Sequence, residues 1–460
     1  MHLSLRRMPN GTKRSWSMAI LPESRASSRG VLDAPLLGVS SNWFTVVALC
    51  GMVAVICSID RTAMSVAVLP MGVKYGWSDT VKGAVSSAFN LGHTLTNFYG
   101  GVLAAAYSPK IVLSIGVIVW SVFTLLTPPA AAMGLVPLFI VRACMGLGEG
   151  VAYPTMQAII KGWVPMERRS RSLSIMYSGH QVGSIVSLLW SPIIIASAGV
   201  DVMFYVYGAM GFVWLAIWEP CITKDPPLLH DHRPQPPAPK RLSDLPWGKI
   251  FSNRVFWALM ACHSTFGVIY NTAISWMPRY YNSEFSLDVR SSSFLSVLPW
   301  LAMAGGTNVS GWLADFLINR KLLSTSHTRK LLQVVGSAGP AICLLYLAWG
   351  APKEQEAKGV PQQAQLTNAV VLLVLTMAFL GFQAGGFAST HQDIATRMAS
   401  VLFGTTNASA SLAGSAFVYA VGVILDRTQS WARVFELIAG CCLTSAAIFV
   451  VFATSEPQFD

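Results

Sequence analysis

The sequence predicts an all-α membrane protein in which twelve transmembrane helices form two six-helix halves. The first observation is composition: 53% of the 460 residues are hydrophobic and 12% are charged, whereas soluble domains carry about 25% charged residues. The second is that apolar runs of about 20 residues, the length that crosses a bilayer core, recur along the chain. The third is a polar, proline-rich stretch that separates the first six runs from the last six.

The expected spans follow one another with turn residues between them. Pro128 and Pro129 come after the third span, Glu219 and Pro220 after the sixth, and Pro352 after the ninth, and proline is typical of such boundaries. The twelve spans are expected at residues 43–69, 80–107, 111–130, 134–160, 171–197, 201–219, 254–281, 290–318, 330–350, 367–391, 396–425 and 431–454.

The chain is therefore expected to have five parts. The stretch between the halves is too polar to enter lipid and too rich in proline for a long helix, which is typical of a linker. The two halves also echo each other, because GVLAAAYSPK from Gly101 and GWLADFLINR from Gly311 share a pattern that follows the second span of each half. The parts are a basic tail at 1–42, six-helix bundles at 43–219 and 254–454, a cytoplasmic linker at 220–253 and a C-terminal tail at 455–460.

The basic residues set the orientation in the membrane. A net charge of +11 could suggest a nucleic-acid partner. However, the lysines and arginines lie mainly in loops, and the loops on the side of the termini hold roughly twice as many as the opposite loops, which predicts that both termini lie inside. We expect no nucleic-acid partner. Arg61 and Arg142 are the two basic residues that fall well inside apolar spans.

Four charges in the first half are candidates for chemistry. Asp60 and Arg61 are adjacent in the first span, about 100° apart on a helix, so each needs its own partner. Arg142 and Glu149, in RACMGLGEGVAYP, lie two turns apart, about 10 Å along the axis. Gly146 and its neighbouring glycines permit close helix approach. The spacing does not fit a dinucleotide loop, because no strand precedes it.

Two interpretations of these charges are open. They can be internal salt bridges, but buried ion pairs often add little net stability. They can also form an anion site, because arginine stays charged and offers a fork of donors to carboxylate or phosphate, while a buried glutamate can alternate between protonated and ionised forms. The second interpretation predicts anion transport coupled to H⁺ or Na⁺. No motif indicates an enzyme, a metal site or a cofactor.

The motifs resemble the anion:cation symporter branch of the major facilitator superfamily. The resemblance rests on Asp60-Arg61, on RACMGLGEGVAYPTMQAIIKGWVPMERRSRS, on ADFLINRKLLSTSHTRK and on HQDIATRMAS, and it covers roughly residues 43 to 454. The branch contains sodium-phosphate cotransporters, sialin, vesicular glutamate transporters, bacterial sugar-acid symporters and plant plastid phosphate transporters. It implies the major facilitator fold, which works by alternating access.

The resemblance also implies roles for individual residues. Arg61 is expected to contact the anion, Glu149 to be the protonatable coupling carboxylate, and Asp60 and Arg142 to form a charge pair that responds to it. His263 stands where plant phosphate-type members usually carry histidine, which favours the phosphate-like branch. The full set is substrate-binding Arg61, Arg142, Tyr153, His263 and Asn407, ion-coupling Glu149, Asp60 and His180, and gating Asp315, Arg168 and Arg171.

Several positions leave alternatives open. Ala105 replaces the aspartate that the family carries between the second and third spans, which affects the gating balance. His180 and His263 can line the pathway, whereas His93 and His391 are better explained as neutral imidazoles bonded between helices. Asn407 can face the cavity or bond a neighbouring helix.

The expected function is secondary active transport of a small anion, inorganic phosphate or an organic anion, by a monomeric unit in a lipid bilayer. One alternative is a carboxylate-specific transporter for glutamate, sialate or ascorbate, and another is a non-transporting anion receptor on the same fold. The Arg- and Ser-rich tail is typical of a transit peptide or of a cytoplasmic tail. A plastid or other organelle membrane and the plasma membrane therefore both remain open.

Overall fold

The computed structural model describes residues 43–164, 166–222, 246–349, 361–395 and 399–459. These residues contain helices and no strand, as predicted. The described residues belong to one compact unit. The predicted tail at 1–42 and most of the linker at 220–253 lie outside the described residues, so those boundaries stay predictions.

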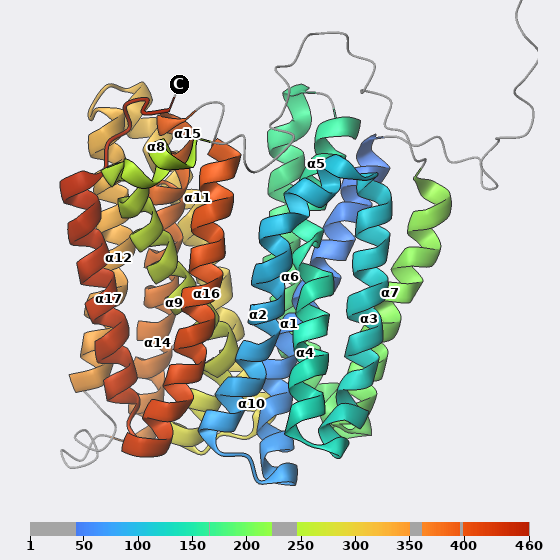
Figure 1. Cartoon of the computed structure of the whole chain (residues 1–460). Coiled ribbons are helices and arrows are strands. Elements are labelled where there is room, and N and C mark those ends of the chain that lie inside the picture. Colours follow the sequence, from blue (N-terminus) through green and yellow to red (C-terminus); the bar gives the residue numbers. More distant parts are fainter. Residues whose placement is uncertain (1–42, 165, 223–245, 350–360, 396–398, 460) are drawn as a thin grey trace, which may run out of the picture. The chain divides into compact units, whose positions relative to one another are not determined.

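The helices of the first half occupy the places of the first six expected spans (Figure 1). The fourth span is two helices, because Pro154 has no N–H to bond the carbonyl of Gly150 and the ladder breaks at Val151. The elements are α1 (Trp43–Tyr75), α2 (Asp79–Ala106), α3 (Pro109–Met133), α4 (Leu135–Gly150), α5 (Ala152–Trp163), α6 (Met166–Ala198) and α7 (Val200–Cys221).

The second half repeats the arrangement with more interruptions. The eighth expected span is divided into α10 and α11, and the tenth into α14, η3 and α15. The elements are α8 (Trp247–Ser252), α9 (Arg254–Phe285), α10 (Val289–Leu295), α11 (Val297–Asn319), α12 (Thr325–Trp349), α14 (Gln362–Gly381), η3 (Phe382–Ala384), α15 (Phe387–Ile394), α16 (Ala399–Thr428) and α17 (Trp431–Phe452).

Within the described residues, 9 helical segments are long and apolar enough to cross a membrane. The three remaining expected spans are α2, α9 and the α10–α11 pair, which are helical but less apolar. Polar residues within them lower the hydropathy, as Asn90, His93 and Asn97 do in α2. Polar residues in a transmembrane helix usually face the bundle interior or an aqueous path, so these helices are the ones expected around a central site.

Glycines let the helices of the first half approach closely. A Cβ at Gly146 on α4 would overlap the carbonyl oxygen of Phe89 on α2, and a Cβ at Gly148 would overlap the backbone of Trp120 on α3. Small residues at such crossings allow backbone contact in membranes. The glycines around Glu149 therefore let α4 pack closely against α2 and α3; the sequence predicts the close approach but not its partners.

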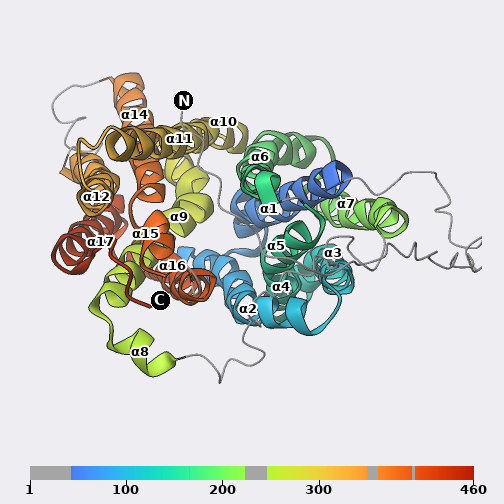
Figure 2. The same ribbon diagram turned by 90° about the horizontal axis from the view of Figure 1, so that it is seen from above.

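Helices α2 and α16 make the most extensive contact between the two halves and run side by side in both views (Figures 1 and 2). The Ser87 hydroxyl donates to the carbonyl of Ser415 at 2.8 Å, and the Asn407 amide donates to the Asn97 side-chain oxygen at 3.3 Å. The two halves therefore meet through polar contacts at Ser87 and Asn97, within α2.

Candidate functional site

Arg61 on α1 and Glu149 on α4 form an ion pair with 2.8 Å between Nη2 and Oε1. The arginine side chain is 14% exposed and the glutamate side chain is fully buried. Nε of Arg61 and Oε2 of Glu149 have no hydrogen-bond partner among the described residues. The pair is thus incompletely satisfied, although buried polar atoms usually find partners.

Phe89 on α2 lies between the two buried arginines. The guanidinium carbon of Arg61 is 5.1 Å from the ring centroid, and that of Arg142 is 5.3 Å away. Both distances fit cation–π contacts. Sequence reasoning missed Phe89, because a phenylalanine within an apolar span carries no signal of its own.

Arg142 and Asp60 are buried close to the Arg61–Glu149 pair, each 1% exposed. Arg142 contacts the sulfur of Met145 at 3.1 Å, and neither carboxylate oxygen of Asp60 has a hydrogen-bond partner in the described part of the chain. Asp60 and Arg142 therefore lie within range of each other's charge but are not joined by a hydrogen bond. Arg142 also makes no hydrogen bond to Glu149 here, as their spacing on one helix suggests.

A small cavity of about 20 Å³ adjoins the two arginines and draws its walls from both halves. Such a volume holds a water molecule. Five of its polar lining residues are Arg61, Arg142, Ser65, Asn90 and Asn271. Asn271 belongs to α9 of the second half, so the arginines of the first half face polar groups of the other.

Three further predicted residues lie near the interface of the halves. Tyr153 packs edge-on against His180, with 6.0 Å between ring centroids. His180 forms a hydrogen bond with Tyr270 on α9. Asn407 bonds Asn97 of the opposite half, so it bonds a neighbouring helix and also sits where the halves meet.

His263 lies elsewhere, inside the second half. Its Nδ1 is 2.9 Å from the Thr406 hydroxyl, and Nε2 of His391 is 2.9 Å from that same hydroxyl. The imidazole is 4% exposed and packs between the rings of Phe387 and Phe403 at 4.8 and 5.0 Å. The structure does not bring His263 to the arginine cluster, and His391 is bonded between helices, as expected.

The structure describes the side chain of one predicted gating residue, Asp315. Asp315 is exposed on α11 and makes no ion pair with any described residue. The side chains of Arg168, Arg171 and Ala105 lie outside the described residues. Their gating roles therefore stay predictions.

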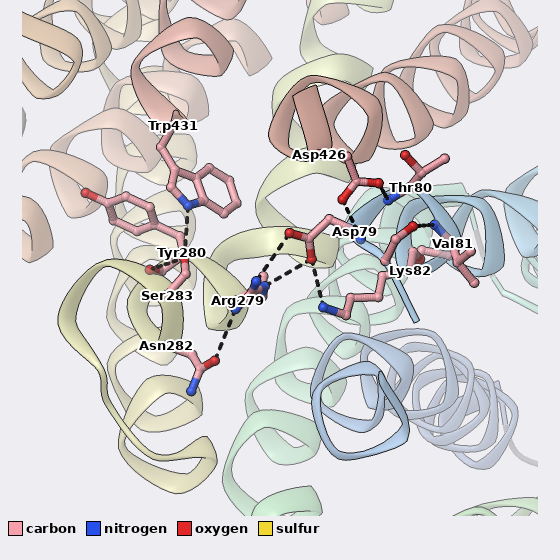
Figure 3. Close-up of polar contacts among 12 residues, drawn as sticks. Asp79, Thr80, Val81, Lys82, Arg279, Tyr280, Asn282, Ser283, Asp426 and Trp431 are labelled. Carbon is pink, nitrogen blue, oxygen red and sulfur yellow. Dashed lines mark hydrogen bonds and ion pairs between the residues drawn. The ribbon is translucent and has the colours of Figure 1, made fainter. Parts of the chain in front are cut away.

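A second charged cluster closes the two halves together where α2 begins (Figure 3). The Asp79 carboxylate accepts hydrogen bonds from Arg279 Nε and Nη2, both at 3.2 Å, and from Lys82 Nζ at 2.8 Å. Asp426 on α16 accepts from the backbone N–H groups of Asp79 and Thr80 at 2.9 and 2.7 Å. This end of the helices is the outer side in the orientation predicted from the basic residues. We call these contacts the outer closure.

The outer closure uses a helix terminus as well as side-chain charges. The first N–H groups of a helix lack partners within it, and the terminus carries a partial positive charge. Ser78 caps α2 locally by accepting from Val81 N, and Asp426 caps it from the other half. Nothing in the sequence indicates this network, because Arg279 and Lys82 lie far apart in the chain.

The chain is similar to known families and structures over nearly all of its length. The family model described as Major Facilitator Superfamily matches residues 50–417. The chain is 38% identical over 425 residues to a protein named sodium-dependent phosphate transport protein 1, chloroplastic, from Arabidopsis thaliana, covering 91% of this chain and 80% of that one. It is 35% identical over 460 residues to the Arabidopsis thaliana ascorbate transporter, chloroplastic, covering 96% and 82%.

Two solved structures share the fold at low sequence identity. A bacterial homolog of the human lysosomal transporter Spinster gives a TM-score of 0.72 at 16% identity, covering 90% of this chain and 97% of that chain. A D-xylose-proton symporter gives 0.71 at 13% identity, covering 90% and 98%. At such identities the likeness concerns the arrangement of the helices alone.

Proposed function

The chain belongs to the major facilitator superfamily, and we propose that it moves a small anion, inorganic phosphate or an organic anion, across a membrane by alternating access. The family confirms the predicted class, a twelve-helix membrane protein in two repeated halves. Relatives named as phosphate and ascorbate transporters support an anionic substrate. They also keep the carboxylate-specific alternative within the proposal.

The observation that carries the proposal is the Arg61–Glu149 pair. The carboxylate holds the guanidinium at 2.8 Å. An entering anion and the ionised Glu149 compete for Arg61, so a cation that neutralises Glu149 releases Arg61 to the anion. Each ligand then makes binding of the other more favourable, which is the thermodynamic requirement for coupling.

The cation in this proposal is H⁺ or Na⁺. Protonation of the Glu149 carboxyl removes the charge directly, whereas Na⁺ would have to lie beside the carboxylate. Asp60, buried next to Arg61 with both oxygens unpartnered in the described part of the chain, is the second carboxyl that can share the charge change. Arg142 then keeps the net charge of the cluster close to balance when both ligands are bound.

The outer closure is the set of contacts that must change when the protein opens to the outer side. Alternating access requires that the contacts on one side of the site break while those on the other side form. The Asp79–Arg279 and Asp426–α2 contacts join the halves on the outer side, so opening to that side requires them to separate. The proposed functional unit is one chain.

The plant relatives also bear on location. The proteins with 38% and 35% identity are both named chloroplastic, which supports a plastid membrane for this chain. Residues 1–42 would then act as a transit segment, in keeping with their Arg- and Ser-rich composition.

The test is uptake of labelled phosphate and of labelled ascorbate into proteoliposomes, with proton and Na⁺ gradients imposed separately. We expect saturable uptake driven by one gradient and lost in Arg61→Ala. Arg433→Ala is the control, because Arg433 is a surface residue 68% exposed. Binding of either anion without uptake under any gradient would reject transport and favour a receptor.

A further inference from the structure

His180 and Tyr270 form a side-chain contact between the two halves close to Arg61. His180 belongs to α6 and Tyr270 to α9, and His180 Nε2 is hydrogen-bonded to the Tyr270 hydroxyl. The rings are stacked with 5.9 Å between centroids and 21° between planes. The pair thus joins the halves by a directional bond between two neutral groups.

The backbone of His180 is fixed one turn from Arg61. The Ser58 hydroxyl, three residues before Arg61 on α1, donates to the carbonyl of His180 at 2.6 Å. Ser58 also contacts Ser184 at 2.9 Å. A Cβ at Gly183 would overlap the carbonyl oxygen of Val55, so α1 and α6 touch through their backbones. This packing fixes the backbone of His180 against α1, the helix that carries Arg61.

Tyr270 is held just as firmly in the second half. Its ring stacks on Phe266 at 5.6 Å and meets Trp300 edge-on at 5.1 Å. The position of the hydroxyl is therefore determined by packing within the second half. The Tyr270 hydroxyl can therefore orient His180 only while the two halves are in contact at this level.

The hydrogen bond also selects the tautomer of His180. The Tyr270 hydroxyl has no other hydrogen-bond partner among the described residues, so its proton is satisfied only by donation to Nε2. A neutral imidazole that accepts at Nε2 carries its own proton on Nδ1. Nδ1 of His180 is buried and has no partner in the described structure.

Two buried donors on the packed helices α1 and α6 are therefore left without acceptors among the described residues. One is Nδ1–H of His180 and the other is Nε–H of Arg61, and Arg61 lies within electrostatic range of His180 and Tyr270. Donors left without partners carry a free-energy cost, which an acceptor bound between them removes. A neutral imidazole suits this place, because two positive charges at close range repel each other.

We propose that His180 donates a neutral N–H to the anion held by Arg61, and that Tyr270 of the opposite half is the positioning residue that fixes this tautomer. The inference rests on the proposed anion transport and deepens it. It gives His180 a substrate-contacting role in place of the ion-coupling role predicted from sequence. The donors for the anion then depend on both halves.

The experiment compares Tyr270→Phe, His180→Asn and His180→Gln with the wild-type protein. Phenylalanine keeps the ring stacking and removes the hydroxyl. Asparagine places an amide donor near the position of Nδ1, whereas glutamine reaches only toward Nε2. Tyr280→Phe is the matched control, since Tyr280 lies on the same helix and its hydroxyl makes no hydrogen bond with described residues.

Two readouts are needed: KM and maximal rate for labelled phosphate and ascorbate in proteoliposomes, and Kd for the same anions with purified protein. A neutral hydrogen bond is worth about 0.5–1.5 kcal/mol, so we expect Tyr270→Phe to raise KM and Kd about two- to tenfold. The maximal rate should change less than about twofold. His180→Gln should raise Kd more than His180→Asn, and the response to the cation gradient should persist in all variants.

Either of two results would overturn the inference. One is an unchanged Kd in both Tyr270→Phe and His180→Gln. The other is an unchanged Kd with loss of gradient-driven accumulation in His180→Gln, which would make His180 a proton carrier. If the wild-type protein binds and transports neither anion, the proposed function itself fails, and that result is separate from a defect confined to the variants.

Discussion

Arg61 and Glu149 stand 88 positions apart in the chain, on α1 and α4, and their side chains meet at 2.8 Å inside the first half. A charge-assisted bond of this kind is roughly twice as strong as a neutral one. It occupies the group that an anion needs. The Glu149 carboxylate therefore takes the place at Arg61 that a substrate anion would occupy.

Replacing Glu149 by glutamine should separate anion movement from the cation gradient. Glutamine is neutral, as is the protonated glutamate, and leaves Arg61 available. We expect exchange of internal for external labelled anion to remain, while accumulation driven by the gradient falls at least about tenfold. Glu436→Gln is the control, since Glu436 is a surface residue paired with Arg433. A Glu149→Gln protein that still follows the gradient fully would contradict the coupling role.

Replacing Arg61 by lysine should weaken anion binding while keeping the charge. Lysine cannot offer the planar fork of donors that matches an oxyanion. Bonds to charged groups are worth about 1.5–3 kcal/mol, so we expect KM to rise about 10- to 100-fold. Initial uptake rates over a range of anion concentrations measure this. The same shift in Arg433→Lys would show that the effect is not local to the site.

Replacing Asp79 by asparagine should loosen the outer closure. It removes the charge that accepts from Arg279 and Lys82, and a loss of about 1–2 kcal/mol corresponds to a factor of about 5 to 30 in the population of outward-open protein. Ser86, which lines the small cavity beside Arg61, is replaced by cysteine as a reporter. A membrane-impermeant maleimide added from the outer side should label Ser86→Cys several times faster in the Asp79→Asn background. Equal labelling rates would mean that Asp79 does not hold this side closed.

Asp426 should act through the terminus of α2. Loss of a capping side chain costs about 0.5–2 kcal/mol, so Asp426→Ala should speed labelling of Ser86→Cys by about 2- to 30-fold. Asp426→Asn keeps an acceptor for the N–H groups of Asp79 and Thr80 and should have a smaller effect. If asparagine and alanine behave alike, the charge at the helix terminus, and not the hydrogen bonds, carries the contact.

Gly146→Ala should destabilise the first half. The new Cβ would overlap the Phe89 carbonyl, and overpacking of this kind costs about 1–3 kcal/mol. Thermal unfolding of the purified protein should show a lower Tm than wild type. Gly305→Ala is the matched control, because a Cβ there meets nothing within 4 Å. Equal Tm values for the two variants would show that the close approach at Gly146 does not affect stability.

The sequence alone predicts well where the helices lie, but it does not predict which helices pack against each other. Runs such as 43–69 and 431–454 are long and apolar enough that burial in lipid decides their structure, and they correspond to α1 and α17. The break at Val151 also follows from the proline three residues later. The helices begin and end a few positions from the predicted limits, because capping residues and not the ends of the apolar runs determine where a helix ends.

The site was predicted in its charges but not in its geometry. Arg61 and Glu149 stand out because ionised groups are rare inside spans, yet their partnership depends on how α1 packs against α4 and α6. Phe89 and Tyr270 gave no signal, because aromatic residues are ordinary in such helices. His263 was expected at the site, but its partner Thr406 lies in α16 and holds it within the second half.

The outer closure makes the two faces of the membrane unequal for a solute that approaches the carrier. From the side where α2 begins, a solute can bind only after the Asp79–Arg279 and Asp426 contacts have separated, so the free energy of those contacts is subtracted from its binding free energy. If they hold by about 2 kcal/mol, the apparent affinity from that face is about 30-fold weaker than it would be without them. Half-saturation then differs between the two faces even without a gradient, although net accumulation still requires one.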